Sequence, residues 1–177
     1  HKPGRALEKI HYEWQIFGDY GTFRDLQRHR IVDMMEWQRL TVHYGYDVPK
    51  LVREAGLEAD FHLCFQNSHA LHQHLIDWGL EEEAQYATLL GHWMRYRFMM
   101  NAREAFHLHE LRTGPQGHPG YRKIVNEMHL KLLEVTPLLG QAMRFVNQGE
   151  DPQLTRMAAE LAVQHKLAKL ALPTEAS

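Results

Sequence analysis

Hydrophobic and polar residues alternate in two stretches of the chain, at residues 10–17 (IHYEWQIF) and 93–100 (WMRYRFMM). A period of two places successive side chains on opposite faces, so both stretches are predicted to be β-strands. Residues 34–42 are a plausible further strand, and the glycine and proline of residues 44–49 indicate a loop after it. The pattern therefore predicts a small sheet in a chain that otherwise favours helices.

Apolar side chains recur every three or four residues between Leu57 and Trp78, which is the strongest helical signal of the chain. We expect this stripe to pack in the core together with Cys64, because cysteine in such a stripe behaves as a small hydrophobic residue. Gly79 should end the helix, and residues 80–92 should form another, since their first turn is acidic. The other predicted helices are residues 19–28, capped by Asp19 or Thr22; one opened by Pro49; residues 102–111; one opened by Pro119; and one from Asp151 and Pro152 to about Leu170.

The composition is that of an ordinary globular protein. The chain has 177 residues, of which 44% are hydrophobic, so it is long enough to bury one core. The net charge of -2 gives no global basic field, so we expect neither a nucleic acid nor a membrane as partner. No apolar run approaches the roughly 18 to 20 residues that cross a bilayer. A single cysteine can form no internal disulfide, which fits a reducing compartment and a cytoplasmic location.

The two ends of the sequence suggest how the chain is organised. Its first residue is His1 rather than Met, so we expect a fragment, a processed product or one part of a longer polypeptide. Residues 1–8 are interpreted as a linker, residues 9–172 as a single domain and residues 173–177 as a frayed tail.

Two short clusters carry the candidate chemistry. Arg28-His29-Arg30 places two guanidiniums around one imidazole and favours an anionic ligand, for which a phosphorylated cofactor is the natural candidate. Part of this charge also has a structural explanation, because cations stabilise the C-terminal end of a helix. The second cluster combines Asn101 and Arg103 with Arg112.

The order and spacing of these clusters resemble the two signature segments of the flavin-dependent thymidylate synthases, over about residues 23–128. The resemblance implies a helix-rich α+β fold with a mixed or antiparallel sheet wrapped by helices. It also implies a homotetramer with FAD sites at subunit contacts. The implied reaction is the reductive methylation of dUMP to dTMP, with methylenetetrahydrofolate as one-carbon donor, NADPH as reductant and no need for an active-site cysteine.

The resemblance also assigns roles, position by position. The residues implied to bind the cofactor are Arg28, His29, Arg30, Glu36, Asn101, Arg103 and Gln116. Substrate binding is implied for Arg39, Gln38, Gln85 and Arg112. Arg112 is also the catalytic candidate, since it would orient the nucleotide. Arginine forks pair bidentately with phosphate, and cationic donors stabilise a reduced, anionic flavin, so these roles are physically sensible.

The sequence departs from the family pattern at the nucleotide side. Gln38 stands where the family has a serine, Arg39 comes one residue early, and Gln85 replaces an arginine. Losing a charged partner of a phosphate costs about 1.5 to 3 kcal/mol, which is roughly tenfold to hundredfold in affinity. Two interpretations therefore stay open. The chain is an active synthase, or it is a non-catalytic domain that binds flavin or nucleotide, or that only stabilises an oligomer or a tandem partner.

The tandem interpretation makes this chain the C-terminal half of two related domains. The other half would then supply the missing serine and arginine, because sites built between subunits tolerate such a division of labour. A related domain upstream of His1 is the corresponding expectation.

Fourteen histidines raise the question of a metal site. Four of them, His62, His69, His72 and His74, crowd one predicted helix, and His69 and His72 are three residues apart. Zinc sites need three or four converging ligands, usually with cysteine or a carboxylate among them. The sequence therefore favours solvated or partly buried histidines, and no metal is expected.

Overall fold

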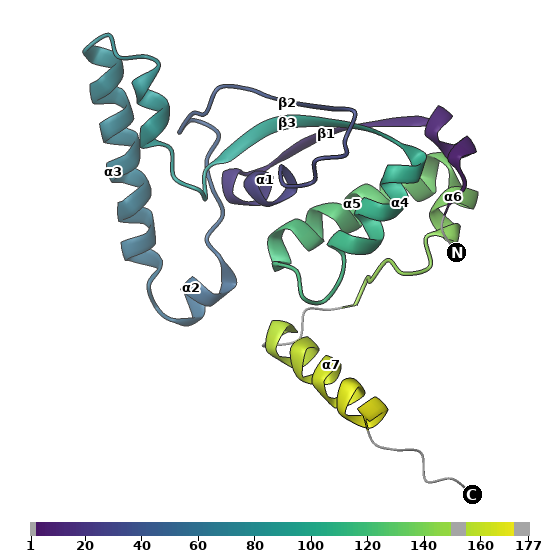
Figure 1. Cartoon of the computed structure of the whole chain (residues 1–177). Coiled ribbons are helices and arrows are strands. Elements are labelled where there is room, and N and C mark those ends of the chain that lie inside the picture. The colour runs from purple at the N-terminus through teal and green to yellow at the C-terminus, as the bar shows by residue number, and fades with distance from the viewer. Residues whose placement is uncertain (1–2, 150–154, 172–177) are drawn as a thin grey trace, which may run out of the picture. The chain divides into compact units, whose positions relative to one another are not determined.

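A computed structural model describes residues 3–149 and 155–171 of the chain, which divides into two compact units (Figure 1). Unit 1 comprises residues 1–104 and unit 2 comprises residues 105–177, and each is described by itself. The elements of unit 1 are η1 (Arg5–Lys9), β1 (His11–Asp19), α1 (Tyr20–Leu26), β2 (Met34–Trp37), α2 (Lys50–Glu54), α3 (Glu58–Asp77), η2 (Glu83–Ala87) and β3 (Trp93–Asn101). Helix α4 (Ala102–Arg112) crosses the division, and α5 (Pro119–Val135), α6 (Pro137–Ala142) and α7 (Thr155–Ala171) follow it.

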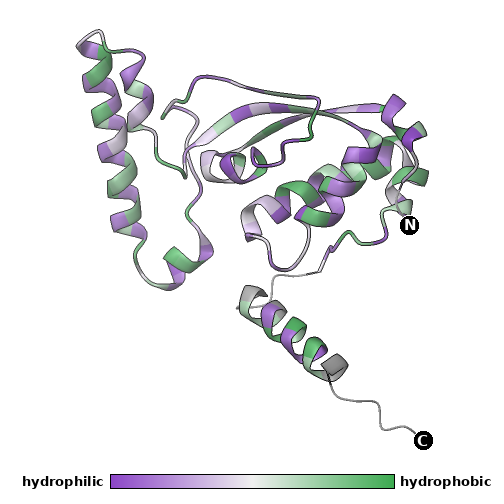
Figure 2. Ribbon diagram, in the orientation of Figure 1, coloured by the Kyte–Doolittle hydropathy of each residue, from purple (hydrophilic) through white to green (hydrophobic). Residues whose placement is uncertain are grey.

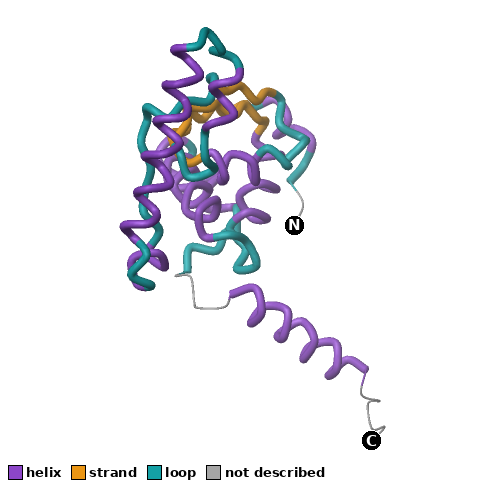
Figure 3. Tube along the Cα trace, turned by 90° about the vertical axis from the view of Figure 1, so that its left-hand side faces the viewer, coloured by secondary structure: helices purple, strands orange, loops and turns teal. Residues whose placement is uncertain are grey.

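The three strands form one antiparallel sheet in the order β1-β3-β2, with β3 in the centre. Figure 3 shows the strands in orange. Every second residue of β3 is buried, as its alternating sequence predicts, and these residues are Met94, Tyr96, Phe98 and Met100. Phe23 of α1 packs against this row, with its ring centroid 4.9 Å from that of Tyr96. The two strands with the clearest alternation are therefore paired to each other, which confirms both predictions.

Asp19 caps α1, as one of the two sequence alternatives expected. Its carboxylate accepts hydrogen bonds of 2.7 Å from both the backbone N–H and the hydroxyl of Thr22. These bonds satisfy donors that a helix start would otherwise leave open. The helix ends at Leu26, so the Arg28-His29-Arg30 segment lies in the turn that follows it.

Helix α3 has the predicted length, and Gly79, with a φ of 75°, ends it. The expectation of a buried stripe is confirmed at Phe65, which is 5% exposed, but is wrong for the stripe as a whole. Leu71 is 52% and Trp78 67% exposed, and Cys64 is exposed too. Helical spacing identifies an apolar face but does not say that the same chain covers it, and Figure 2 shows hydrophobic residues along the whole helix.

The prediction of a helix at residues 80–92 was also wrong, because only the short 3-10 helix η2 forms there. Side chains take over the backbone groups that a longer helix would have paired. Ser68 of α3 donates a hydrogen bond of 2.6 Å to the Ala87 carbonyl, and the Leu89 N–H donates one of 2.9 Å to His92 Nδ1. Side-chain bonds of this kind compete with a regular helix.

Three further boundaries differ from expectation. Strand β2 stops at Trp37, although the sequence suggested a strand as far as Val42. Helix α6 was not predicted, and η1 lies largely inside the stretch interpreted as a linker. The last helix is present as α7, whereas its expected cap at residues 151–152 and the tail at 173–177 lie outside the described residues. The domain limits stay a prediction.

Unit 2 is built on α5, whose start the sequence predicts correctly. His118 Nδ1 accepts a hydrogen bond of 3.1 Å from the Gly120 N–H, and Pro119 is the first helical residue. Val125, Met128 and Leu132 are buried at helical spacing, as expected. Among the described residues of either unit, no helix is long and apolar enough to span a bilayer.

The buried Tyr96 hydroxyl provides a first test of this packing. Tyr96 is 1% exposed, its hydroxyl meets no hydrogen-bond partner in the described part of the chain, and burial raises its pKa. Tyr96→Phe removes that unpaired group, so we expect the free energy of unfolding in urea to rise by about 1 kcal/mol. Tyr46→Phe is the matched control, because the Tyr46 hydroxyl shares a 2.7 Å hydrogen bond with His62 and its loss should destabilise. A Tyr96→Phe variant that loses stability as the control does would contradict this account.

Candidate functional site

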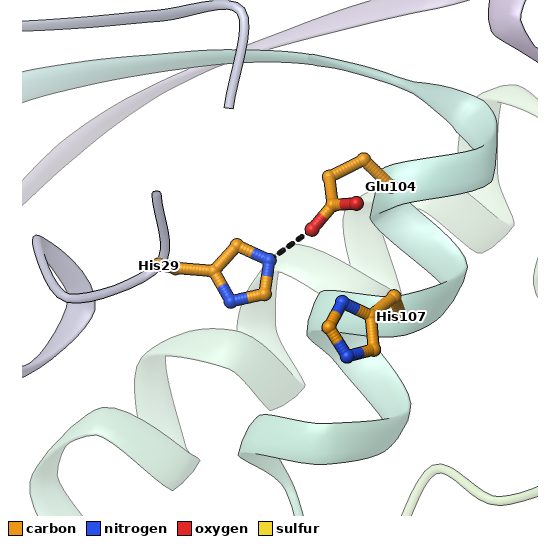
Figure 4. Close-up of side chains that lie close together, drawn as sticks. All are labelled: His29, Glu104 and His107. Carbon is orange, nitrogen blue, oxygen red and sulfur yellow. Dashed lines mark hydrogen bonds and ion pairs between the residues drawn. The ribbon is translucent and has the colours of Figure 1, made fainter. Parts of the chain in front are cut away.

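A buried hydrogen bond joins the two clusters that the sequence singled out. His29 Nε2 and Glu104 Oε1 share this bond across 75 residues of sequence, and both residues are nearly inaccessible, at 5% and 8% exposure (Figure 4). The polar groups of a buried pair such as this are satisfied by each other rather than by water. The middle residue of Arg28-His29-Arg30 is thus an anchor for that segment in unit 1.

The first turn of α4 holds the other side of this anchor in place. Asn101 Oδ1 accepts a 2.9 Å hydrogen bond from the Glu104 N–H, so Asn101 acts as a helix cap. Asn101 and Glu104 have the spacing of a capping box, which was the signal in the sequence that could have identified Glu104. His107 follows one turn later on α4 (Figure 4).

Three arginines are adjacent in sequence to the two residues of this anchor. Arg28 and Arg30 flank His29 in sequence, Arg103 precedes Glu104, and all three are exposed. Adjacent Cα atoms are about 3.8 Å apart, so the bond between His29 and Glu104 keeps the three arginines on neighbouring backbone. We call Arg28, Arg30 and Arg103 the arginine group.

One member of the arginine group is already paired. Arg103 Nη1 lies 2.7 Å from Glu8 Oε1, and Arg5 also bonds Glu8. Arg5 first and Arg103 second hold the pKa of Glu8 below its ordinary value, so this carboxylate stays charged. An exposed ion pair of this kind is worth little, which leaves Arg103 available to a stronger anion.

Three of the four predicted substrate residues lie in two segments of unit 1 that are bonded to each other. Arg39 forms an ion pair with Glu82, and Gln85 Oε1 accepts a 3.1 Å hydrogen bond from the Leu40 N–H. Gln38 lies just before them, and its Oε1 accepts a 3.0 Å hydrogen bond from the Tyr44 hydroxyl. The segment after β2 and the segment around η2 are therefore joined by the residues that the sequence assigned to the substrate.

The pocket beside these segments has a volume of about 510 Å³. Its lining residues are Tyr20, Leu40, Glu82, Glu83, Gln85, Tyr86 and Thr88. Tyr86 is 90% exposed and offers a ring on which a base can stack, while the Gln85 amide offers a donor and an acceptor. Two carboxylates in the lining disfavour a phosphate unless Arg39 turns from Glu82 toward it. Sequence reasoning missed Tyr20, Tyr86 and both glutamates, because their meeting depends on η2.

The remaining predicted residues lie apart from these two places. Glu36 is an exposed residue of β2, 3.9 Å from Arg97 of the neighbouring strand. Arg112 and Gln116 belong to unit 2, where the Arg112 guanidinium lies 5.5 Å from the centroid of the Tyr121 ring. Gln116 is exposed in the loop before α5.

The fold of the chain is similar to that of a solved nucleotide methylase. It superimposes on the crystal structure of a UMP/dUMP methylase, PolB from Streptomyces cacaoi, with a TM-score of 0.67 and 17% identity, over 84% of this chain and 77% of the other. This likeness confirms the predicted helix-rich α+β fold. Residues 1–138 match the family model described as thymidylate synthase complementing protein. The chain therefore belongs to the thymidylate synthase complementing protein family, which confirms the resemblance seen in its two clusters.

Curated relatives are similar along most of this chain but are much longer. A UPF0159 protein from Chlamydia muridarum is 36% identical over 150 residues, covering 85% of this chain and 28% of the relative. The UPF0159 protein Ta1429 from Thermoplasma acidophilum is 32% identical over 161 residues, covering 90% of this chain and 32% of the relative. The chain thus spans about three tenths of the length of these relatives.

Proposed function

We propose that this chain binds FAD and a uridine nucleotide and takes part in the reductive methylation of dUMP to dTMP. The observation that carries the proposal is the buried bond between His29 and Glu104, which holds the arginine group of two distant segments together. Family membership supports thymidylate synthase-like chemistry in general. The nucleotide is proposed from PolB, whose structure is described as bound with 5-Br dUMP.

The donor set of the arginine group fits a flavin cofactor. Arg28, Arg30 and Arg103 are permanently charged, exposed, and able to pair with the diphosphate of FAD. When bound, a reduced flavin would supply the hydride, and methylenetetrahydrofolate and NADPH are the proposed co-substrates. Asn101 contributes by capping α4, which fixes the backbone of Arg103. His29 is buried, so its proposed role is to hold Arg28 and Arg30 in place rather than to contact the cofactor.

The proposed nucleotide side is the pocket that Gln85 lines, together with Gln38 and Arg39 of the segment bonded to it. The pair between Arg39 and Glu82 is 65% exposed on both side chains, so it contributes at most about 1 kcal/mol. A charge-assisted bond from Arg39 to a phosphate is worth about 1.5 to 3 kcal/mol. The bond of Arg39 to a phosphate would thus be stronger than its bond to Glu82, whereas the charges of Glu82 and Glu83 oppose the phosphate. Arg112 stays a proposed substrate residue and catalytic candidate, and Glu36 and Gln116 stay proposed cofactor residues.

A second candidate function is a non-catalytic domain that only stabilises a longer polypeptide or an oligomer. The specific observation in its favour is that Gln38 and Gln85 already make internal hydrogen bonds, to Tyr44 and to Leu40. A homotetramer or a tandem pair of related domains, in the cytoplasm, belongs to either proposal. The much greater length of the relatives leaves room for such a partner domain.

Flavin binding distinguishes the two functions. We expect the purified chain to bind FAD, with an absorption spectrum that shifts when dUMP is added. An Arg28→Ala/Arg30→Ala double variant should bind FAD at least about tenfold more weakly, because each lost charged bond costs about 1.5 to 3 kcal/mol. Arg53→Ala is the matched control, since Arg53 is an exposed arginine of α2 outside both clusters.

The outcomes separate the alternatives. A flavin spectrum that does not change when dUMP is added would support the cofactor site and contradict the proposed nucleotide site. A well-folded chain that binds no FAD would favour the non-catalytic function. Equal FAD affinity in the double variant and in Arg53→Ala would remove the arginine group from the proposal.

A further inference from the structure

An arginine on the outer face of the sheet carries a charge that the described part of the chain does not neutralise. Arg95 is the third residue of β3 and is exposed, and its side chain points away from the core because its neighbours Met94 and Tyr96 are buried. Arg97, the next residue on the same face, shows the contrast, since its guanidinium lies 2.9 Å from the Glu13 carboxylate. Arg95 forms no such ion pair with a described carboxylate, so an external anion can use its charge.

Two aromatic rings hold the Arg95 guanidinium in place. Its Cζ lies 5.0 Å from the centroid of the ring of Phe17, its partner on β1, and 5.6 Å from that of the Tyr44 ring. The two rings stand edge to face with centroids 5.7 Å apart, and the Trp93 ring packs on Phe17 at 5.2 Å. Stacking uses the flat face of a guanidinium and leaves the N–H donors on its edge open. Arg95 is thus ordered before a ligand binds, which reduces the entropy lost on binding.

The register of the sheet places Arg95 beside Gln38. Trp37, the last residue of β2, pairs with Tyr96. The next residue continues this ladder, because the Gln38 N–H donates a 3.2 Å hydrogen bond to the Arg95 carbonyl. Side chains of directly paired residues lie on the same face of a sheet, with Cβ atoms about 4.5 to 5.5 Å apart. Tyr44 also joins the two, since its hydroxyl donates to Gln38 Oε1 while its ring contacts Arg95.

This position adds a cation where the proposed nucleotide side lacks one. Gln38 stands where the family has a serine, and Gln85 replaces an arginine. The two glutamates of the pocket lining oppose a phosphate inside the pocket, whereas Gln38 and Arg95 are not part of that lining. Leu40, which lines the pocket, is two residues from Gln38, so their Cα atoms are at most about 7 Å apart. A nucleotide with its base in the pocket can extend over this gap and place its phosphate at Arg95.

We propose that Arg95, with Gln38 beside it, binds the phosphate of the uridine nucleotide. This inference rests on the proposed function, because it assigns the phosphate contact of the nucleotide that the function requires. A planar guanidinium donates two parallel hydrogen bonds to a phosphate, and the Gln38 amide offers a further donor. Arg39 can then remain paired with Glu82 while the phosphate is bound.

The test measures dUMP binding to the full chain by isothermal titration calorimetry, with FAD present. We expect Arg95→Gln to bind dUMP at least about tenfold more weakly than the wild type, because it loses a charged bond to the phosphate. Arg95→Lys keeps the charge without the planar fork and should recover part of this loss. Deoxyuridine, which has no phosphate, should bind equally to the wild type and to Arg95→Gln. Arg53→Gln, at an exposed arginine of α2, is the matched control and should bind dUMP as the wild type does.

Circular dichroism verifies that each variant is folded, and FAD affinity should be the same in Arg95→Gln and in the wild type. Equal dUMP affinity in these two proteins would overturn the inference and leave the nucleotide function standing. A loss of FAD affinity in place of dUMP affinity would also overturn it, because the anion at Arg95 would then belong to the cofactor. The same holds if deoxyuridine binding falls as much as dUMP binding, since Arg95 would then not act on the phosphate. A wild-type chain that binds no dUMP would contradict both the inference and the nucleotide side of the proposed function.

Discussion

Glu104→Ala is expected to lower the free energy of unfolding by about 3 to 5 kcal/mol, because it removes one partner of a buried pair. His29 and Glu104 are both nearly inaccessible, so the vacated position would leave the imidazole buried without its carboxylate. Glu104→Gln should cost much less, since the amide oxygen can still accept a hydrogen bond from the ring. Urea unfolding, followed by circular dichroism, measures both.

The control and the pairwise test make this prediction specific. Glu127→Ala, at an exposed position of α5, should change stability by less than about 0.5 kcal/mol. In a double-mutant cycle with His29→Ala, the two substitutions should couple by about 0.5 to 3 kcal/mol, because the residues are in contact. Additive losses would show that the bond between His29 and Glu104 does not hold the two segments together.

The same variants separate folding from ligand binding. Where Glu104→Gln is folded at room temperature, FAD affinity should stay close to that of the wild type, because the arginine group keeps its support. Glu104→Ala, assayed where it is still folded, should bind FAD more weakly, since the turn that carries Arg28 and Arg30 loses its anchor. Unchanged FAD affinity in Glu104→Ala would separate the anchor from the cofactor site.

Local periodicity predicted most of the elements but not what covers them. The alternation in β1 and β3 is a property of each strand alone, so the sequence was sufficient to identify both. The apolar face of α3 was equally visible, yet Leu71 and Trp78 are exposed, because burial depends on a partner that periodicity does not name. The prediction of a helix at residues 80–92 was wrong for a related reason, because Ser68 of α3 donates a hydrogen bond to the Ala87 carbonyl of that segment.

The candidate site shows the same limit. Sequence order and spacing led to Arg28-His29-Arg30 and to Arg103, and the family assignment is confirmed. The partner that anchors His29 was not anticipated, because Glu104 is 75 residues away and nothing local links the two. The contacts of His43 with His69 and His72 are of the same kind, since these rings meet only in the folded chain. The cofactor, the nucleotide and the assembly stay predictions.

Acid is expected to destabilise the chain through a histidine pair in unit 2. His109 is completely inaccessible and His129 is 4% exposed, and their Nδ1 atoms lie 3.4 Å apart. Burial, and secondarily His129, lower the pKa of His109 from 6.5 to about 3 in the folded chain. Burial lowers the pKa of His129 as well. Both shifts favour neutral imidazoles, one of which donates and the other accepts.

The sign of the effect follows from which state binds the proton. Between pH 6.5 and about 3, the unfolded chain takes up a proton at His109 that the folded chain refuses. Stability is therefore unaffected by this residue above pH 6.5 and falls progressively below it. Two pH units below 6.5, the loss from His109 is about 3 kcal/mol, because each unit is worth about 1.4 kcal/mol.

His109→Gln should remove this sensitivity to acid. We expect a modest cost near neutral pH from repacking, and a fall in stability between neutral pH and about pH 4.5 that is smaller than in the wild type by about 3 kcal/mol. His165→Gln, at an exposed histidine of α7, is the matched control and should keep the wild-type fall. Urea unfolding at the two pH values gives one difference in stability for each of the three proteins, and comparing these differences cancels the effect of other titrating groups. If His109→Gln loses as much stability in acid as the wild type, the pair takes up its protons in the folded state, and its burial does not limit the acid stability of the chain.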